Sequence, residues 1–232
     1  MTWSDFPAAA VRLPAVEGVN PSVDAVALYR PDLVILYFSD DRHAAAFEVL
    51  DIPVAIFDPR NYDQVASDIE KLGVLCGRPD RAAELARTMR ERRDAVRQRT
   101  AGMSPLRVYV EVDGADDARP WTAGPGSFVN ELIESAGAVN VFASLERPFA
   151  QVSLEEILRA RPDVILLAGI AGDPQAARER LSRRPAFSLL PAVKMGRIIH
   201  RIDKDRLTRT GPRLADGLEE LAAALHRMDR HP

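Results

Sequence analysis

SVDAVALYRPDLVIL at residues 22–36 and SLEEILRARPDVILL at residues 153–167 are two copies of one pattern. In each copy a serine can cap a helix by accepting a backbone N–H bond, and an acid two residues later lies near the positive end of the helix dipole. The Arg-Pro-Asp triplet predicts the end of the helix, because proline disfavours α geometry in the residue before it. The apolar run that follows does not alternate with polar residues, which is typical of a strand buried on both faces.

The repeat decides the fold class. Two copies of a short helix that leads into a buried strand predict an α/β protein with two similar lobes, each built on a central parallel sheet. The copies align without a gap, and the serine, arginine, proline, aspartate and last leucine are identical. The alternative is a chance similarity between two ordinary helix–strand units.

A long helical segment separates the two copies. Residues 51–58 predict one more buried strand, Asn61 caps a helix that runs to about residue 76, and a second helix covers residues 80–100. That second helix alone spans roughly 30 Å. Its narrow apolar stripe and charged remaining faces suit a rod that joins two lobes, and a surface helix of one domain is the alternative. We therefore expect an N-terminal lobe over residues 1–61, a connecting helical segment over 62–102 and a C-terminal lobe over 103–232.

The second lobe shows the order of elements expected of an α/β lobe. Residues 106–112 predict a strand, and a loop rich in glycine, aspartate and proline follows over residues 113–126. Ser127 predicts the start of the next helix. Residues 197–203 predict a late strand, and residues 212–228 predict the closing helix, with leucines and alanines on its buried face.

Composition excludes two classes of function. The chain has 232 residues, 47% of them hydrophobic, and a formal net charge of −3, so it lacks the basic surface that holds a nucleic-acid backbone. Cys76 is the only cysteine, which rules out an intramolecular disulfide and a cysteine metal cluster, and its apolar helical surroundings predict a core position. The four histidines show no convergent spacing with carboxylates, so direct binding of a bare metal ion is not expected.

The amino terminus carries no targeting signal. MTWSDFP lacks the basic start, the apolar core and the cleavage site of a signal peptide. The longest apolar runs, residues 32–38 and 164–170, are strand-sized and far below the roughly 20 residues that span a bilayer. As it stands, the sequence predicts a cytoplasmic location.

Five segments, in order along nearly the whole chain, carry a family resemblance: Asn20–Val34, Trp121–Phe142, Val152–Leu166, Leu190–Ile199 and Thr210–Leu214. They resemble class III periplasmic binding proteins, the solute-binding subunits of ABC importers for cobalamin (vitamin B12) and ferric chelates such as iron siderophores. The cobalamin-binding branch is the most similar. The resemblance implies two Rossmann-like lobes joined by one long helix, a ligand in the cleft between them, and a permease as partner. It also implies a monomer with no enzymatic activity and no cofactor.

Two acids match the positions with which this family docks on its permease. They are Asp24 and Glu155, each in the first turn of a repeat helix. Asp24 stands where the family usually has glutamate, so its reach is one methylene shorter. The alternative role for both acids is to complement the helix dipole.

Aromatic residues are scarce, and their placement predicts where a large, partly apolar chelate binds. Tyr37 and Phe38 follow the carboxyl end of a predicted strand, where α/β sheets bind their ligands. Trp121 lies in the Gly-rich loop, and Phe149 precedes the second repeat helix, where the cobalamin-binding branch has an aromatic residue. Trp3 completes the predicted set of ligand-contacting aromatics, and the alternative for each of them is a core position.

Arg206 is the last predicted ligand residue. It lies in the segment 204–209, which the resemblance implies is a loop facing the cleft. The resemblance implies an aromatic residue at this position, so an arginine favours an anionic ligand, for example a carboxylate-bearing siderophore. The alternative is a solvated surface charge. Position alone also allows Tyr37 to ligate a haem iron.

The resemblance also implies that this chain starts late. The family has a strand, a helix and a second strand before the position of Trp3, and their loss should expose a sheet edge and apolar faces in a truncated first lobe. A misplaced start codon, a cloned fragment and a real cytoplasmic variant would each explain the difference. With a misplaced start, a signal peptide upstream would direct the protein to the periplasm or the outer face of the membrane.

Two other functions compete with ligand delivery. Gly124–Val129 reads GPGSFV, a Gly-rich turn at a helix start that could cradle the phosphate of a nucleotide-dependent enzyme. It lacks both the G-x-G-x-x-G and the P-loop patterns, and no Ser/His/Asp or Cys/His arrangement is visible. The other competitor is a cytoplasmic or degenerate relative with no transport role.

Overall fold

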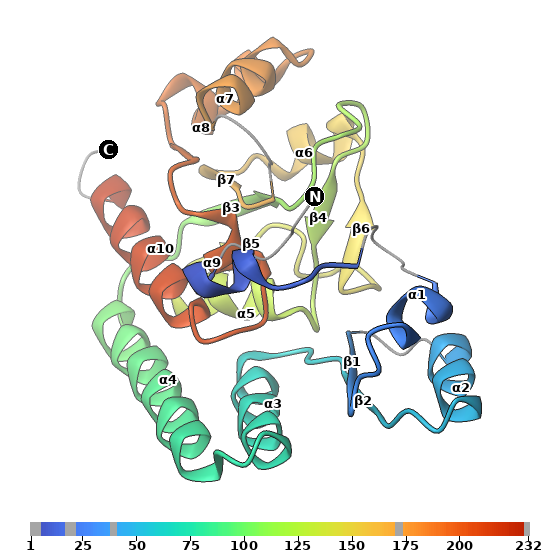
Figure 1. Ribbon diagram of the computed structural model, residues 1–232. Helices are drawn as coiled ribbons and strands as arrows, with labels where there is room; N and C mark the ends of the chain where they lie inside the picture. The colour runs from blue at the N-terminus through green and yellow to red at the C-terminus, as the bar shows by residue number, and fades with distance from the viewer. Residues whose placement is uncertain (1–5, 17–21, 38–40, 170–173, 230–232) are drawn as a thin grey trace. The chain divides into compact units, whose positions relative to one another are not determined.

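The chain builds two α/β units, which divide between Asp58 and Pro59 and are described separately (Figure 1). The computed structural model describes residues 6–16, 22–37, 41–169 and 174–229. The α/β class and the parallel sheets predicted from the repeat are confirmed, and so is the long helix predicted over residues 80–100. The division into lobes over 1–61 and 103–232 with a connecting segment over 62–102 stays a prediction.

The first unit contains a two-stranded parallel sheet. Its elements are η1 (Ala8–Arg12), α1 (Val23–Ala27), β1 (Val34–Tyr37), α2 (Asp41–Val49) and β2 (Val54–Phe57). The two strands pair in register from Val34 opposite Val54 to Tyr37 opposite Phe57. The predicted cap on α1 is confirmed, because the Ser22 hydroxyl accepts a hydrogen bond of 3.2 Å from the backbone N–H of Ala25.

The first unit has a small apolar core. Among its described hydrophobic residues only Val34, Phe47 and Phe57 are buried. The exposed large ones are Phe6, Val11, Leu13, Leu28, Tyr29, Ile35, Tyr37, Val49, Leu50 and Ile56. Exposed apolar side chains are therefore present at the carboxyl ends of α1 and α2 and on both strands of the sheet.

The second unit is built on a four-stranded parallel sheet in the order β5-β3-β7-β8, together with a two-stranded antiparallel ribbon, β4-β6. Its strands are β3 (Arg107–Glu111), β4 (Trp121–Ala123), β5 (Val139–Asn140), β6 (Phe149–Gln151), β7 (Val164–Leu167) and β8 (Ile198–Ile199). Its helices are α3 (Tyr62–Leu75), α4 (Pro79–Thr100), α5 (Phe128–Ser135), α6 (Leu154–Ala160), α7 (Pro174–Arg183), η2 (Phe187–Leu189), α8 (Pro191–Lys194), α9 (Lys204–Thr208) and α10 (Leu214–Asp229).

Helices cover both faces of the four-stranded sheet, which explains why β3 and β7 are apolar without alternation. One core cluster joins Val108, Val110 and Leu166 to α4, α5 and α10. The other joins Tyr109 and Ile165 to α6, α7 and α8 (Figure 1). Successive residues of one strand thus enter opposite cores, as strand geometry requires.

Within the second unit, the long helix α4 is held to α3 and α10 by ion pairs as well as by its apolar stripe. Arg92 contacts both Asp216 and Glu219 of α10, each at 2.7 Å. Arg93 contacts Asp63 of α3 at 2.8 Å. The hydrogen bonds that Arg92 donates to Glu219 outweigh the effect of burial and raise the pKa of Arg92. The helix is therefore fixed firmly to its neighbours over its central turns.

Three local details differ from the sequence predictions. The predicted loop over residues 113–126 contains strand β4, and the predicted strand over residues 197–203 is limited to Ile198 and Ile199. Arg30 and Arg161, which precede the two repeat prolines, have φ angles of 48° and 45° instead of extended geometry. Both copies of the repeat therefore have a left-handed residue directly before the proline, although only Arg161 is the cap of its helix, since α1 ends earlier, at Ala27.

Candidate ligand-binding site

The antiparallel ribbon β4–β6 lies at the carboxyl end of the central strand β3. The backbone N–H of Val112 donates to the carbonyl of Trp121 at 2.9 Å, and the N–H of Trp121 donates to the carbonyl of Asp113 at 2.8 Å. A side chain at Gly169, just after β7, would place its Cβ 1.2 Å from the Val112 carbonyl oxygen. The ends of β3 and β7 therefore meet closely, at the edge where α/β sheets bind ligands.

Two predicted ligand residues, Trp121 and Phe149, come together on this ribbon. Trp121 pairs with Gln151, and Ala123 pairs with Phe149, so the two aromatic side chains share one face as diagonal neighbours. The ring of Phe149 packs edge-on against Phe128 of α5, with centroids 6.5 Å apart. Trp121 is 42% exposed. Phe149 is thus supported by Phe128, and Trp121 presents an accessible ring.

The loop beside the ribbon is held by buried polar contacts. The backbone N–H of Gly124 donates to the carbonyl of Pro148 at 2.8 Å. The side-chain amide of Asn140 donates to the carbonyl of Ala123 at 2.7 Å and to Asn130 at 2.9 Å. These bonds fix the backbone beneath Trp121 and Phe149 before a ligand binds. The protein therefore loses less conformational entropy on binding.

The start of α5 does not offer the phosphate cradle considered for Gly124–Val129. The Ser127 hydroxyl donates to the carbonyl of Gly124 at 2.7 Å and accepts from the backbone N–H of Asn130 at 3.1 Å. Ser127, Phe128 and Val129 are all buried. The helix start is therefore capped by its own serine and covered by protein.

A buried ion cluster lies directly beneath this edge and was missed from the sequence. Glu111, the last residue of β3, is 0% exposed. Arg184 binds both of its carboxylate oxygens, at 2.5 Å and 3.0 Å, and Arg180 of α7 approaches one of them at 3.3 Å. The Tyr109 hydroxyl donates to Glu111 at 3.1 Å. The acid at the end of an apolar strand was the one signal in the sequence that could have revealed this cluster.

The cluster ties the loop after β3 to the region of α7. Arg184 and Arg180 both contact Asp117 of that loop, at 3.0 Å and 3.2 Å. Burial opposes the charge on Arg184, but the hydrogen bonds that it donates to Glu111 and Asp117, with the charge of Glu111, outweigh burial and raise the pKa of the guanidinium. Burial also raises the pKa of Tyr109, and the charge of Glu111 adds to the effect. The tyrosine therefore stays neutral and acts as a hydrogen-bond donor.

The two predicted docking acids are both exposed in the first turn of a helix. Asp24 lies in α1 and Glu155 lies in α6. The side chain of Glu155 is 81% exposed and contacts Arg159 at 3.0 Å. The capping box of α6 is completed by Glu156, whose pKa is lowered by hydrogen bonds from the backbone and side chain of Ser153. Glu155 is therefore not needed for the cap.

The other predicted site residues are placed as follows. Tyr37 ends β1 in the first unit and is 42% exposed. Trp3 and Phe38 lie outside the described residues. Arg206 belongs to helix α9, where a loop was expected, and its guanidinium forms an ion pair with Glu220 of α10. A ligand contact by Arg206 would compete with this ion pair.

Cysteine and histidine take no part in a metal centre over the described ranges. Within those residues no group of three or more histidine, cysteine, aspartate or glutamate side chains converges. Cys76 is exposed, which corrects the predicted core position. It follows the last residue of α3 and precedes Gly77, whose positive φ of 66° is typical of the residue after a helix end. None of the helices described is long and apolar enough to cross a membrane.

Known proteins match this chain along most of its length. The profile of the family described as "Periplasmic binding protein" matches residues 7–204. The vitamin B12-binding protein of Yersinia pestis (strain Pestoides F) is 29% identical over 173 residues, covering 72% of this chain and 60% of that protein. The chain therefore spans about 60% of the length of the curated relatives that it matches.

Two solved structures share the fold. The periplasmic vitamin B12 binding protein BtuF of Vibrio cholerae matches with a TM-score of 0.82 and 25% identity, over 98% of this chain and 87% of its own. An ABC-type Fe3+-hydroxamate transport system from Saccharomonospora viridis DSM 43017 matches with a TM-score of 0.80 and 25% identity, over 96% of this chain and 81% of its own. Both likenesses extend over both units.

Proposed function

Because this chain belongs to the periplasmic binding protein family, we propose that it is the substrate-binding component of an ABC importer. It captures a corrinoid such as vitamin B12, or a ferric chelate, and delivers it to a permease. The names of its relatives support this ligand class, since one binds vitamin B12 and another belongs to an Fe3+-hydroxamate transport system. The role requires a location outside the cytoplasm, in the periplasm or at the outer face of the membrane.

The observation that carries the proposal is the aromatic pair on the β4–β6 ribbon. Corrinoids and ferric chelates present broad, partly apolar surfaces, which flat side chains contact over a large area. Trp121 supplies an accessible indole, and Phe149 is supported from behind by Phe128. We propose that Tyr37 supplies the equivalent surface of the first unit. The buried bonds of Asn140 keep the ribbon in place before the ligand arrives.

Ligand class is tested by equilibrium dialysis of the full chain against cyanocobalamin, a ferric hydroxamate, haem and ATP. We expect saturable binding of one chelate, with one ligand per chain at the plateau, and no binding of ATP. Chelate absorbance reports the bound fraction without any label. Binding of ATP alone would refute the proposal in favour of the nucleotide-dependent alternative, and binding of none of the four compounds would refute it in favour of a relative without a transport role.

The permease contact is proposed to involve Asp24 and Glu155. Reversing both charges, Asp24→Lys with Glu155→Lys, is expected to abolish stimulation of ATP hydrolysis by the reconstituted importer, while the affinity for the chelate stays within about twofold. The reason is that exposed charges steer docking, and neither acid belongs to the β4–β6 ribbon. The control carries the same change of charge on α4, Glu84→Lys with Glu91→Lys, both exposed acids. A loss of chelate affinity in the docking variant would show that these acids are structural.

A further inference from the structure

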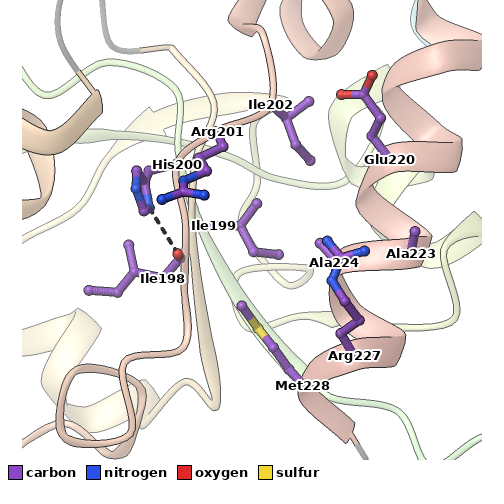
Figure 2. A pocket seen from close by; sticks show the side chains of 10 residues that line it. All are labelled: Ile198, Ile199, His200, Arg201, Ile202, Glu220, Ala223, Ala224, Arg227 and Met228. Atoms are coloured by element: carbon purple, nitrogen blue, oxygen red, sulfur yellow. Dashed lines mark hydrogen bonds between the residues drawn. The ribbon is translucent and has the colours of Figure 1, made fainter.

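A pocket of about 390 Å³ lies in the second unit between the edge strand β8 and helix α10 (Figure 2). It is separate from the β4–β6 ribbon, since none of its lining residues belongs to that ribbon. Ile199 and Ile202 line it from the strand side, and Ala224 and Met228 line it from the helix side. The volume falls in the range of pockets that enclose small organic molecules.

The pocket exists because neither neighbouring element fills the space. Strand β8 ends the sheet order, so no further strand lies beside it in the sheet as described. Helix α10 lines the pocket with Ala223 and Ala224, the smallest side chains of its lining. Ile199, Ile202 and Met228 line the pocket as its apolar wall, with Ile199 buried and the other two half-buried against the core.

Two arginines flank this apolar wall from opposite sides. Figure 2 shows Arg201 on the strand side and Arg227 on the helix side. Neither guanidinium forms an ion pair or hydrogen bond with any residue that the structure describes. Arg227 lies in the last turn of α10, where its charge also complements the helix dipole, but Arg201 has no such role.

Among the described residues that line the pocket, the one carboxylate side chain is already engaged. Glu220 forms an ion pair with Arg206 of α9. The arginines of α4 differ from those of the pocket, because Arg90 and Arg92 both contact carboxylates. The pocket therefore combines an apolar wall with two cationic groups that lack an acidic partner, a combination suited to a molecule with an apolar body and an anionic head.

We propose that this pocket binds a small amphipathic carboxylate, independently of the chelate site. The apolar body packs against Ile199 and Met228, and the carboxylate lies between Arg201 and Arg227. A guanidinium offers a planar fork of donors that matches a carboxylate, and such charge-assisted bonds are the stronger class of hydrogen bond. The site would give the protein a second ligand, chemically distinct from a corrinoid or ferric chelate.

Methyl NMR of the full chain tests the proposal, with dodecanoate as the probe and methionines labelled with ¹³C in their methyl groups. Met228 lines the pocket, Met89 is buried in the core, and Met195 is exposed elsewhere. We expect dodecanoate to produce a saturable shift of the Met228 methyl resonance, with Met89 and Met195 unchanged. The variant Met228→Leu assigns the resonance by removing it.

Charge recognition is tested by the double variant Arg201→Gln with Arg227→Gln. We expect its affinity for dodecanoate to fall at least about tenfold, because it loses both charge-assisted contacts. Dodecanol, which lacks the charge, should bind weakly and equally to both proteins. The matched control Arg87→Gln removes an exposed arginine of α4 and should leave the affinity unchanged. An unshifted Met228 resonance, equal binding of dodecanol and dodecanoate, or an unchanged affinity in the double variant would each overturn the proposal.

Discussion

Replacing Trp121 with alanine is expected to weaken binding of the chelate by roughly 25-fold or more, which corresponds to about 2 kcal/mol. Exposed aromatic anchors contribute most of the contact area in sites of this kind. Folding should be little affected, since the bonds that hold β4 to the end of β3 are made by the backbone of Trp121. Isothermal titration with the chelate identified by dialysis measures the dissociation constant.

Two controls separate a ligand contact from a general effect on the protein. Trp121→Phe keeps a flat ring and should retain most of the affinity. Leu189→Ala removes an exposed apolar side chain from η2, which is not part of the ribbon, and should leave the affinity unchanged. A dissociation constant for Trp121→Ala within twofold of the parent would remove Trp121 from the site.

Removal of the Arg184 guanidinium is expected to give the largest loss of stability. Arg184→Met leaves the fully buried Glu111 without its two shortest ion contacts, and breaking one side of such a pair costs about 3–5 kcal/mol. The exposed Arg87→Met change, which breaks a surface pair with Glu91, should cost less than about 0.5 kcal/mol. Urea unfolding followed by circular dichroism gives the free energy of unfolding for both variants.

A double-mutant cycle shows whether the cost comes from the unpaired carboxylate. Glu111→Leu with Arg184→Met replaces the pair by apolar side chains, and its loss should be clearly smaller than the sum of the two single losses. A double variant whose loss equals that sum would show that the two residues act independently, contrary to the bidentate contact.

The elements that rest on local chemistry were predictable from the sequence. Ser22, Asn61, Ser127 and Ser153 each accept the hydrogen bond expected of a helix cap. Capping depends on residues within three positions of each other, so the sequence contains the required information. The buried parallel strands of the second unit were predictable for a similar reason, because a run of apolar residues without alternation is typical of a strand covered on both faces. The same signal was wrong for the first unit, where Ile35 of β1 and Ile56 of β2 are exposed.

The features that rest on distant partners were not predictable. Strand β4 is short and forms because the ribbon pairs it with Phe149–Gln151, so the loop composition around Trp121 concealed it. Helix α9 is fixed by contacts with α10, including the ion pair of Arg206 with Glu220. The cluster of Glu111 and Arg184 joins residues far apart in the sequence, and no local pattern connects them.

Part of the candidate site could be read from the chain and part could not. Aromatic residues are scarce, and the Gly-rich loop around Trp121 and the family resemblance at Phe149 indicated these two, which the structure brings onto one face of the ribbon. Their support by Phe128 depends on the packing of α5. The burial predicted for Cys76 was wrong. Its neighbours in sequence are apolar, but it lies at the end of helix α3, where it is exposed.

The central claim is that Trp121 lies at a chelate site, and tryptophan fluorescence tests it most directly. The variant Trp3→Phe leaves Trp121 as the single tryptophan of the chain. Titration with the dialysed chelate, corrected for inner-filter absorption, should quench its emission saturably with the dissociation constant found by dialysis. Emission that stays unchanged while dialysis shows the site filled would contradict the claim and move the chelate away from the ribbon.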